Sequence, residues 1–236
     1  VNCPGNPGAW KRHAVYHKAV KRQWKANEDG GVGQQRQRET AERVARDAAQ
    51  SGDEYQKLVA EGLRYVSQRD IRRAGRTFRE AIALRPDRSD AYFNLGAALS
   101  NSGHVVEAAQ RYLEAKERNP VGSEYWAKAT AWTFDMLRQT ECAEVAKPEW
   151  WNDDELKALS ARVVKAVPND LGANQMRASV LCGQCGGAWE LGPRSAAEVK
   201  KAATHYERAA ALSPAPAMKA EFAVFADLCR CQAELM

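Results

Sequence analysis

Residues 93–109 read FNLGAALSNSGHVVEAA, a stretch in which small residues stand at fixed places inside a helical apolar pattern. An ordinary amphipathic helix needs an apolar residue at every third or fourth position, but it needs no glycine or alanine among them. Two antiparallel helices approach each other closely only when the side chains at their crossing are small. Gly96 and Ala108 therefore predict a tightly packed helix pair, with its turn near His104.

The same pattern occurs earlier in the chain, at an interval of about 34 residues, which is the period of one family of helical repeats. Each copy ends at a proline, Pro86 or Pro120, because proline cannot continue a helix and restricts the residue before it. The sequence therefore contains two regular copies of one helix pair. The matched positions are Gly62 and Gly96, Tyr65 and Leu99, Ala74 and Ala108, Phe78 and Tyr112, and Ala81 and Ala115.

This pattern resembles the signature of the tetratricopeptide repeat family, in which W-x2-L-G-x2-Y on a first helix precedes A-x3-F, A and P on a second. Two weaker copies end at Pro168 and Pro214, and an amphipathic helix over 217–235 would cover the last repeat. The resemblance covers residues 55–236. It implies an all-α helical solenoid of about four helix pairs with a C-terminal capping helix, and a protein that binds partner segments instead of performing chemistry.

The two weaker copies are longer than the regular period, and the surplus falls between their helices, at 139–153 and 183–195. Insertions of this kind form loops on one face of a solenoid, so both are expected to protrude. The first contains Trp150 and Trp151; one ring is expected to anchor the loop and the other to contact a partner. Asn152 follows, with two acids behind it, which predicts a helix N-cap.

In the tetratricopeptide repeat family the first helices line an inner groove that holds a peptide segment of another protein. The corresponding positions in this chain are mostly apolar and small, which favours a ligand with an apolar strip, such as a partner helix. Asn94 and Asn101 are placed to hydrogen-bond its backbone; the alternative is that several of the apolar side chains pack between repeats. The predicted groove residues are Val59, Leu63, Val66, Phe93, Asn94, Ala97, Asn101, Ala127, Lys128, Ala131 and Phe134.

Some members of the family grip the acidic tails of chaperones with lysine and asparagine side chains, and Asn94 and Lys128 match that arrangement. Glu61 and Glu124, however, stand where lysines are expected. Their carboxylates would repel a carboxylate ligand, so this kind of clamp is excluded.

The first 26 residues carry six basic side chains and no acid, and a glycine-rich linker, 30–33, separates them from a polar helix over 34–50. The expected domains are this basic arm with its linker, 1–33, and the solenoid, 34–236. Three readings of the arm stay open: it binds RNA or an anionic membrane surface, it docks into a larger assembly, or Trp10 and Trp24 cover the end of the solenoid. The basic residues are Lys11, Arg12, Lys18, Lys21, Arg22 and Lys25.

Trp10, His13 and His17, with Cys3 upstream, resemble the end of a MYND-type zinc finger. A structural zinc site needs four ligands, and only Cys3 and the two histidines are visible, so no metal site is predicted.

Cys182 and Cys185 have the spacing of metal ligands or a redox pair. Their candidate partners, Cys229 and Cys231, are two residues apart on one helix and point in different directions. Thiols are therefore expected at all four positions, in a reducing, intracellular compartment.

Composition and motifs narrow the class of protein. Hydrophobic residues make up 44% and charged residues 28% of the chain, as in an ordinary folded protein, and no window approaches the roughly 18 apolar residues of a membrane span. There is no P-loop, G-x-S-x-G or H-E-x-x-H motif, so neither an enzyme nor a cofactor is predicted. The expected function is a protein-binding adaptor or assembly scaffold in a larger complex; the alternative is an RNA-associated subunit of a large ribonucleoprotein or organellar complex that uses the basic arm.

Overall fold

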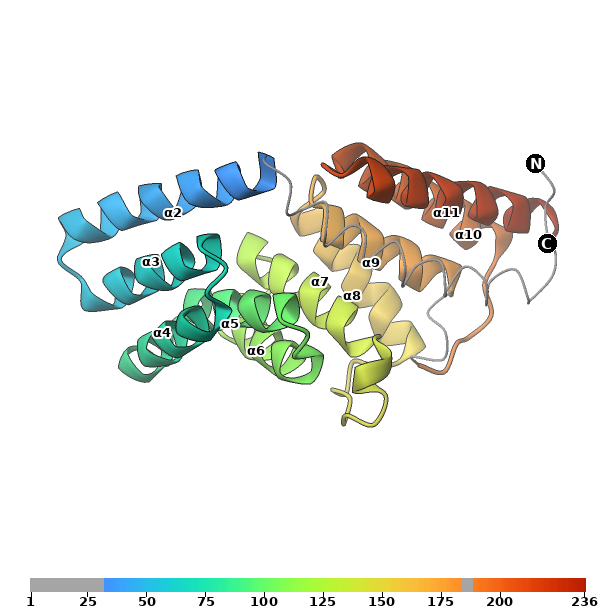
Figure 1. The fold of residues 1–236 in the computed structure, drawn as a ribbon. Helices are drawn as coiled ribbons and strands as arrows, with labels where there is room; N and C mark the ends of the chain where they lie inside the picture. Colours follow the sequence, from blue (N-terminus) through green and yellow to red (C-terminus); the bar gives the residue numbers. More distant parts are fainter. Residues whose placement is uncertain (1–31, 184–188) are drawn as a thin grey trace. The chain divides into compact units, whose positions relative to one another are not determined.

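The computed structural model describes residues 32–183 and 189–236, and in these ranges it contains ten α-helices, one short 3₁₀ helix and no strand (Figure 1). The predicted all-α fold class is confirmed. The described residues belong to two compact units, one within Gly31–Lys147 and one within Pro148–Met236. The boundary between them falls in the first predicted insertion.

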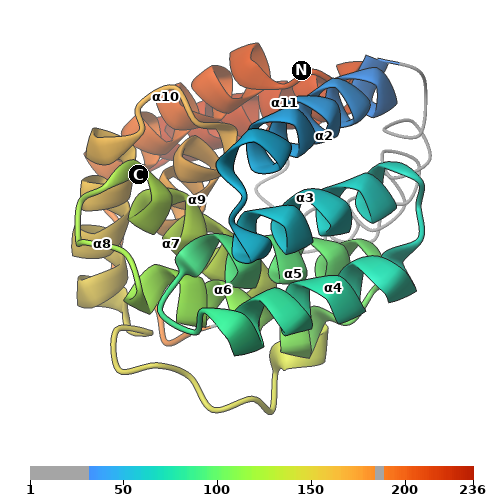
Figure 2. The same cartoon turned by 90° about the vertical axis from the view of Figure 1, so that its left-hand side faces the viewer.

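The first unit is a row of helices in which each packs on the next (Figures 1 and 2). Its elements are α2 (Val32–Ser51), α3 (Glu54–Ser67), α4 (Ile71–Leu84), α5 (Ser89–Asn101), α6 (Val105–Glu117), α7 (Glu124–Leu137) and the 3₁₀ helix η1 (Thr140–Cys142). The pairs α3–α4 and α5–α6 are the two regular helix pairs, as predicted. The polar helix expected over 34–50 is α2; it begins at Val32, so the end of the expected linker is helical.

Short polar side chains and a glycine turn define the ends of these helices. Asp53 accepts a hydrogen bond from the backbone N–H of Tyr55, and Asp70 accepts one from that of Arg73, both at 3.0 Å. These bonds satisfy N–H groups that have no partner within the helix. Between α5 and α6, Gly103 has a φ of 86°, a conformation that glycine adopts without steric cost.

The two helix pairs cross at glycines that lie directly beneath aromatic rings. A Cβ atom on Gly62 would lie 2.4 Å from Cε1 of Phe78, and a Cβ atom on Gly96 would lie 3.1 Å from Cδ1 of Tyr112. Both rings are buried. The ring on the second helix therefore occupies the space that a side chain on the first helix would need, which is the physical reason for the glycine in the pattern.

A hydrogen bond joins the two regular helix pairs. The hydroxyl of Tyr55, on α3, donates to a carboxylate oxygen of Asp90 at the start of α5, and the backbone N–H of Ala91 donates to the same hydroxyl at 3.3 Å. Burial and the neighbouring Asp90 raise the pKa of Tyr55, so the hydroxyl keeps its proton. The bond therefore sets the position of α5 against α3.

Replacing Tyr55 by phenylalanine is expected to lower the free energy of unfolding by about 1–2 kcal/mol, because a hydrogen bond to a charged group contributes about 1.5–3 kcal/mol and Asp90 is only half-buried. Chemical denaturation measures the change. The control is Tyr125→Phe, which removes a hydroxyl from a side chain that is 66% exposed. Equal unfolding midpoints for Tyr55→Phe and the wild type would contradict the assignment.

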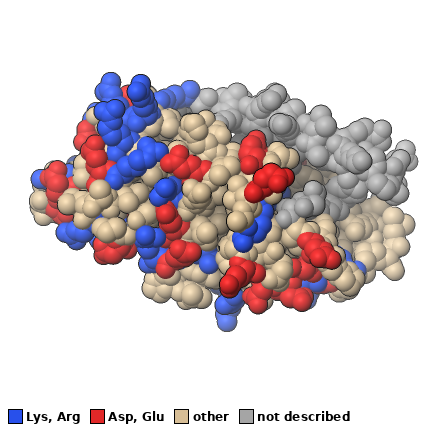
Figure 3. Space-filling model, turned by 90° about the horizontal axis from the view of Figure 1, so that it is seen from below, with Lys and Arg blue, Asp and Glu red and all other residues tan. Residues whose placement is uncertain are grey.

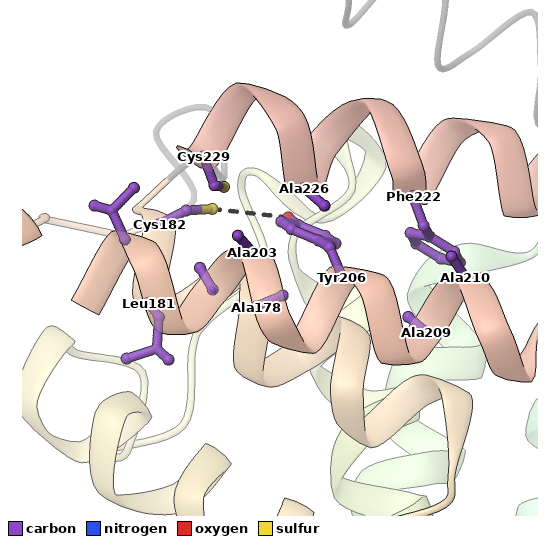
Figure 4. Close-up of a cluster of buried hydrophobic side chains, with 12 residues drawn as sticks. Ala178, Leu181, Cys182, Ala203, Tyr206, Ala209, Ala210, Phe222, Ala226 and Cys229 are labelled. Atoms are coloured by element: carbon purple, nitrogen blue, oxygen red, sulfur yellow. Dashed lines mark hydrogen bonds between the residues drawn. The ribbon is translucent and has the colours of Figure 1, made fainter. Parts of the chain in front are cut away.

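The second unit has four helices in its described residues: α8 (Asp153–Ala166), α9 (Leu171–Cys182), α10 (Ala196–Leu212) and α11 (Pro216–Glu234). Each packs on the next, and the predicted capping helix is α11, which covers α10. Figure 4 shows the core between α9, α10 and α11, where Tyr206 stacks on Phe222 with ring centroids 6.2 Å apart and Ala178 packs nearby. Small residues on all three helices allow the close approach.

The predicted insertions lie between helices, as expected. The first separates α7 from α8, and the second separates α9 from α10. Because the unit boundary falls in the first insertion, the two helices expected to form the third repeat belong to different units.

Candidate partner-binding surface

One face of α5 stays accessible while the opposite face is buried. Phe93, Asn94 and Ala97 are half-buried and Asn101 is exposed, and these are the four α5 positions predicted to line a groove. Their spacing places all four side chains on one side of the helix. The buried side consists of Ala91, Tyr92, Leu95, Gly96, Ala98 and Leu99.

Two side-chain amides lie on the accessible face of α5. Asn94 and Asn101 are seven residues apart, so they stand about 10 Å apart along the helix axis. Neither amide makes a hydrogen bond with another residue in the described part of the chain. Each amide offers both N–H donors and a C=O acceptor, the same groups that a peptide backbone presents.

The α3 positions predicted for the groove differ in burial. Leu63 and Val66 are half-buried. Val59 is 7% exposed and belongs to a core cluster that includes Tyr55 and Ala81. For Val59 the structure therefore agrees with the alternative, in which an apolar side chain packs inside the fold.

The α7 positions require a correction. Ala127, Ala131 and Phe134 are at most 2% exposed, so they do not line an accessible surface. Because α7 has apolar residues on all sides, its sequence did not show which face is buried. Lys128 is half-buried, and its ammonium lies 2.6 Å from the carboxylate of Glu124 and lowers the pKa of that carboxyl. The lysine that matched a carboxylate clamp is thus already paired.

An aromatic row that the sequence analysis did not single out runs from α5 to α7. The rings of Phe93 and Tyr112 form a T-shaped pair with centroids 5.2 Å apart, and Tyr112 stacks on Trp132 with centroids 5.6 Å apart. Trp132 is 40% exposed. Burial, with a smaller effect of Asp135, raises the pKa of Tyr112, so the central ring stays neutral. The signal that could have revealed this row is Trp132, which stands at a position where the repeat signature specifies no residue type.

The comparison with protein families covers this part of the chain. The family model described as tetratricopeptide repeat matches residues 65–131. Over residues 65–131 this chain is similar to the tetratricopeptide repeat family. The matched segment runs from the end of α3 into α7 and includes all of α5 and α6, so the accessible α5 face lies within the matched repeats. A search of curated proteins found no match.

Outside the matched tetratricopeptide repeats, the two insertions meet through tryptophans. Trp151, from the first insertion, forms a T-shaped pair with Trp189, from the second, with ring centroids 5.8 Å apart. The ring centroid of Trp150 lies 5.7 Å from that of Trp151. Trp151 and Trp189 are buried and Trp150 is half-buried, so Trp151 is the predicted anchor. The predicted N-cap is also confirmed, because Asn152 accepts a hydrogen bond from the backbone N–H of Glu155 at 3.0 Å.

An ion pair fastens the second insertion to α8. Arg194 donates from Nη1 to Oδ2 of Asp153 at 2.8 Å, and Trp189 donates from Nε1 to Oδ1 at 3.2 Å. The ammonium of Lys157 also lies 3.3 Å from Oδ2 of Asp153. The Arg194 guanidinium, followed by the bonds from Trp189 and Lys157, holds the pKa of Asp153 well below its usual range. Each of the two predicted loops therefore holds the other in place.

The four cysteines within the described ranges are of two kinds. Cys142, Cys182 and Cys229 are buried and are not in disulfide bonds, whereas Cys231 is disulfide-bonded. The expectation of a thiol was therefore wrong for Cys231. It rested on the different directions of Cys229 and Cys231 on one helix, which exclude a shared site for the two but not a separate partner for Cys231.

Several predictions for the N-terminal part lie outside the described residues. These concern the basic arm, the linker before Val32 and the zinc-finger resemblance, together with Cys185, and they stay predictions. Within 32–183 and 189–236, no group of three or more His, Cys, Asp or Glu side chains is placed to hold a metal ion. In the same ranges, no helix has both the length and the apolar character that a membrane crossing requires.

Proposed function

We propose that this chain is a non-catalytic adaptor or assembly scaffold whose tetratricopeptide repeats hold a segment of a partner protein on the accessible face of α5. The observation that supports this most directly is the pair of amides, Asn94 and Asn101, whose hydrogen-bonding groups the described residues do not use. Helical repeats of this kind generally present extended surfaces to protein partners.

The α5 face suits a segment that offers its backbone and one apolar side chain. The interval of about 10 Å between the amides corresponds to about three residues of an extended chain. Ala97 lies between them, and its small side chain lets a ligand backbone approach the helix. Phe93 supplies apolar area beside the first amide. None of these four side chains is charged, so recognition rests on backbone hydrogen bonds and shape.

The double variant Asn94→Ala/Asn101→Ala is expected to weaken partner binding about tenfold or more, because each lost hydrogen bond costs about 0.5–1.5 kcal/mol. The tagged full chain captures partners from a cell extract, and mass spectrometry quantifies what each variant retains. Titration with the purified partner then gives the change in affinity.

The matched control is Gln68→Ala/Gln110→Ala, which removes two exposed amides from the turn after α3 and from α6. Circular dichroism verifies that all variants keep their helix content. A protein retained by the wild type and the control but lost from the asparagine variant is the expected partner. If all three baits retain the same proteins in the same amounts, the α5 face is not the binding surface.

A further inference from the structure

Three arginines line a shallow hollow on the solvent-facing side of α4. Arg72, Arg76 and Arg79, together with Glu80 and Ala83, surround a volume of about 420 Å³. All five residues lie on one stripe of the helix, at positions i, i+4, i+7, i+8 and i+11. Figure 3 shows the molecule from below, and its left-hand part corresponds to α2 to α4 in Figure 1. Many Lys and Arg atoms lie there, with Asp and Glu atoms between them.

The three arginines differ in how they are paired. Arg79 forms an ion pair with Glu107 of α6 at 2.8 Å, so this stripe already binds one carboxylate from a neighbouring helix. Arg72 and Arg76 are exposed and form no hydrogen bond or ion pair with other residues in the described ranges. By contrast, Arg73, on a different side of α4, is paired with Asp70 at 2.9 Å. Two adjacent guanidinium groups on the stripe therefore have unused donors.

The spacing of the arginines matches a second helix. A guanidinium group binds a carboxylate or phosphate through two parallel hydrogen bonds. Along α4 the rise is about 6 Å from Arg72 to Arg76 and about 6 Å again from Arg76 to Glu80. A helix that runs beside α4 presents its own side chains at the same two intervals. An extended chain repeats on one face about every 6.6 Å, so over these two intervals it falls out of step with α4 by about 1 Å.

The composition of the hollow favours a protein over a nucleic acid. No aromatic side chain lines it, so bases would have no surface on which to stack. Glu80 stands at one end and would repel a phosphate. A protein helix, unlike a nucleic acid, can place a lysine opposite this carboxylate.

We propose that the α4 stripe docks an acidic helix of a partner protein, with carboxylates on Arg72 and Arg76 and a lysine facing Glu80. This surface is separate from the α5 face, and the inference does not rest on the proposed function. Exposed ion pairs contribute modestly to affinity, so the stripe mainly orients the partner and speeds its association.

The test uses the full chain and a fluorescein-labelled, alanine-based helical peptide with glutamates at i and i+4 and a lysine at i+8. A peptide with glutamines in place of the glutamates and a single-stranded oligouridine serve as the other probes. Fluorescence anisotropy is measured at about 0.05 M and about 0.5 M salt, where screening differs strongly. The variant is Arg72→Glu/Arg76→Glu. Its control, Arg162→Glu/Lys165→Glu, makes the same change of charge on exposed positions of α8.

We expect the glutamate peptide to bind at low salt, the α4 variant to weaken this binding about tenfold or more, and the α8 control to weaken it less than about twofold. Asn94→Ala/Asn101→Ala should bind the peptide like the wild type, which separates this result from that of the α5 face. The proposal is overturned if the glutamate peptide does not bind, if the glutamine peptide binds equally well, or if both charge reversals weaken binding alike. Oligouridine that binds more tightly than the peptide, and is lost in the α4 variant alone, would assign the stripe to nucleic acid instead.

Discussion

Gly62→Ala is expected to destabilise the first unit by about 2 kcal/mol, although alanine is a better helix former than glycine. The new Cβ atom would lie 2.4 Å from Cε1 of Phe78 and 2.7 Å from two further ring atoms. Phe78 is fully buried, so its ring has no room to move aside. Overpacking of this kind costs about 1–3 kcal/mol or more, and the gain in helix propensity, about 1 kcal/mol, offsets only part of it.

Two other buried helical glycines provide matched controls for this prediction. A Cβ atom on Gly75 would meet its nearest neighbour, Nη1 of Arg79, at 3.4 Å, so Gly75→Ala is expected to stabilise by about 0.5–1 kcal/mol. Gly96→Ala is intermediate, because its Cβ atom would lie 3.1 Å from the ring of Tyr112. The unfolding midpoint in urea should therefore be highest for Gly75→Ala, lower for Gly96→Ala and lowest for Gly62→Ala.

A second substitution tests whether the aromatic ring is the cause. Phe78→Leu alone is destabilising, but in the Gly62→Ala background it makes room for the new methyl group. The double variant Gly62→Ala/Phe78→Leu should therefore lose less stability than the sum of the losses in the two single variants. Strict additivity, or a Gly62→Ala variant as stable as Gly75→Ala, would show that the helices do not cross at this glycine.

Arg194→Ala is expected to destabilise the second unit by about 3 kcal/mol, because it leaves the carboxylate of Asp153 without its main partner. The side chains of Arg194 and Asp153 are only 7% and 13% exposed. The control is Arg230→Ala, which breaks exposed pairs with Glu207 and Asp227 and should cost less than about 1 kcal/mol. Hydrogen exchange in α8 and α10 measures where the protection is lost.

The same ion pair predicts how stability depends on pH. In the folded chain the pKa of Asp153 lies well below its ordinary value, and the backbone N–H and hydroxyl of Ser195, together with Lys157, lower the pKa of Glu198 to about 2. Because both folded values lie below the unfolded ones, the stabilisation is complete above about pH 4.5 and is lost as the pH falls towards 2.

Thermal unfolding at about pH 7, 5 and 3 measures this dependence. The wild type should lose stability between the last two values, and Arg194→Ala should lose less, because its Asp153 no longer gains from the arginine. Parallel losses in the two proteins would show that the pair does not contribute to acid sensitivity.

The helix pairs could be predicted because their signals are local. The glycines at 62 and 96, the closing prolines and the N-cap at Asn152 each report on a few neighbouring residues, and the structure places all of them as expected. The accessibility of one α5 face could also be predicted, because the small and apolar residues of the repeat pattern mark the opposite face as the packed one. On α7 the same reasoning failed, because apolar residues surround the helix and no face is marked.

The sequence by itself determined the class of fold, the helix pairs and the places where insertions interrupt them, because spacing along the chain controls which small and aromatic residues meet at each crossing. Only the tertiary structure decided which side chains remain accessible and which distant ones pair. The contact of Trp151 with Trp189 and the bond between Asp153 and Arg194 both join residues far apart in the sequence. Packing between such residues leaves no periodic pattern in either segment alone.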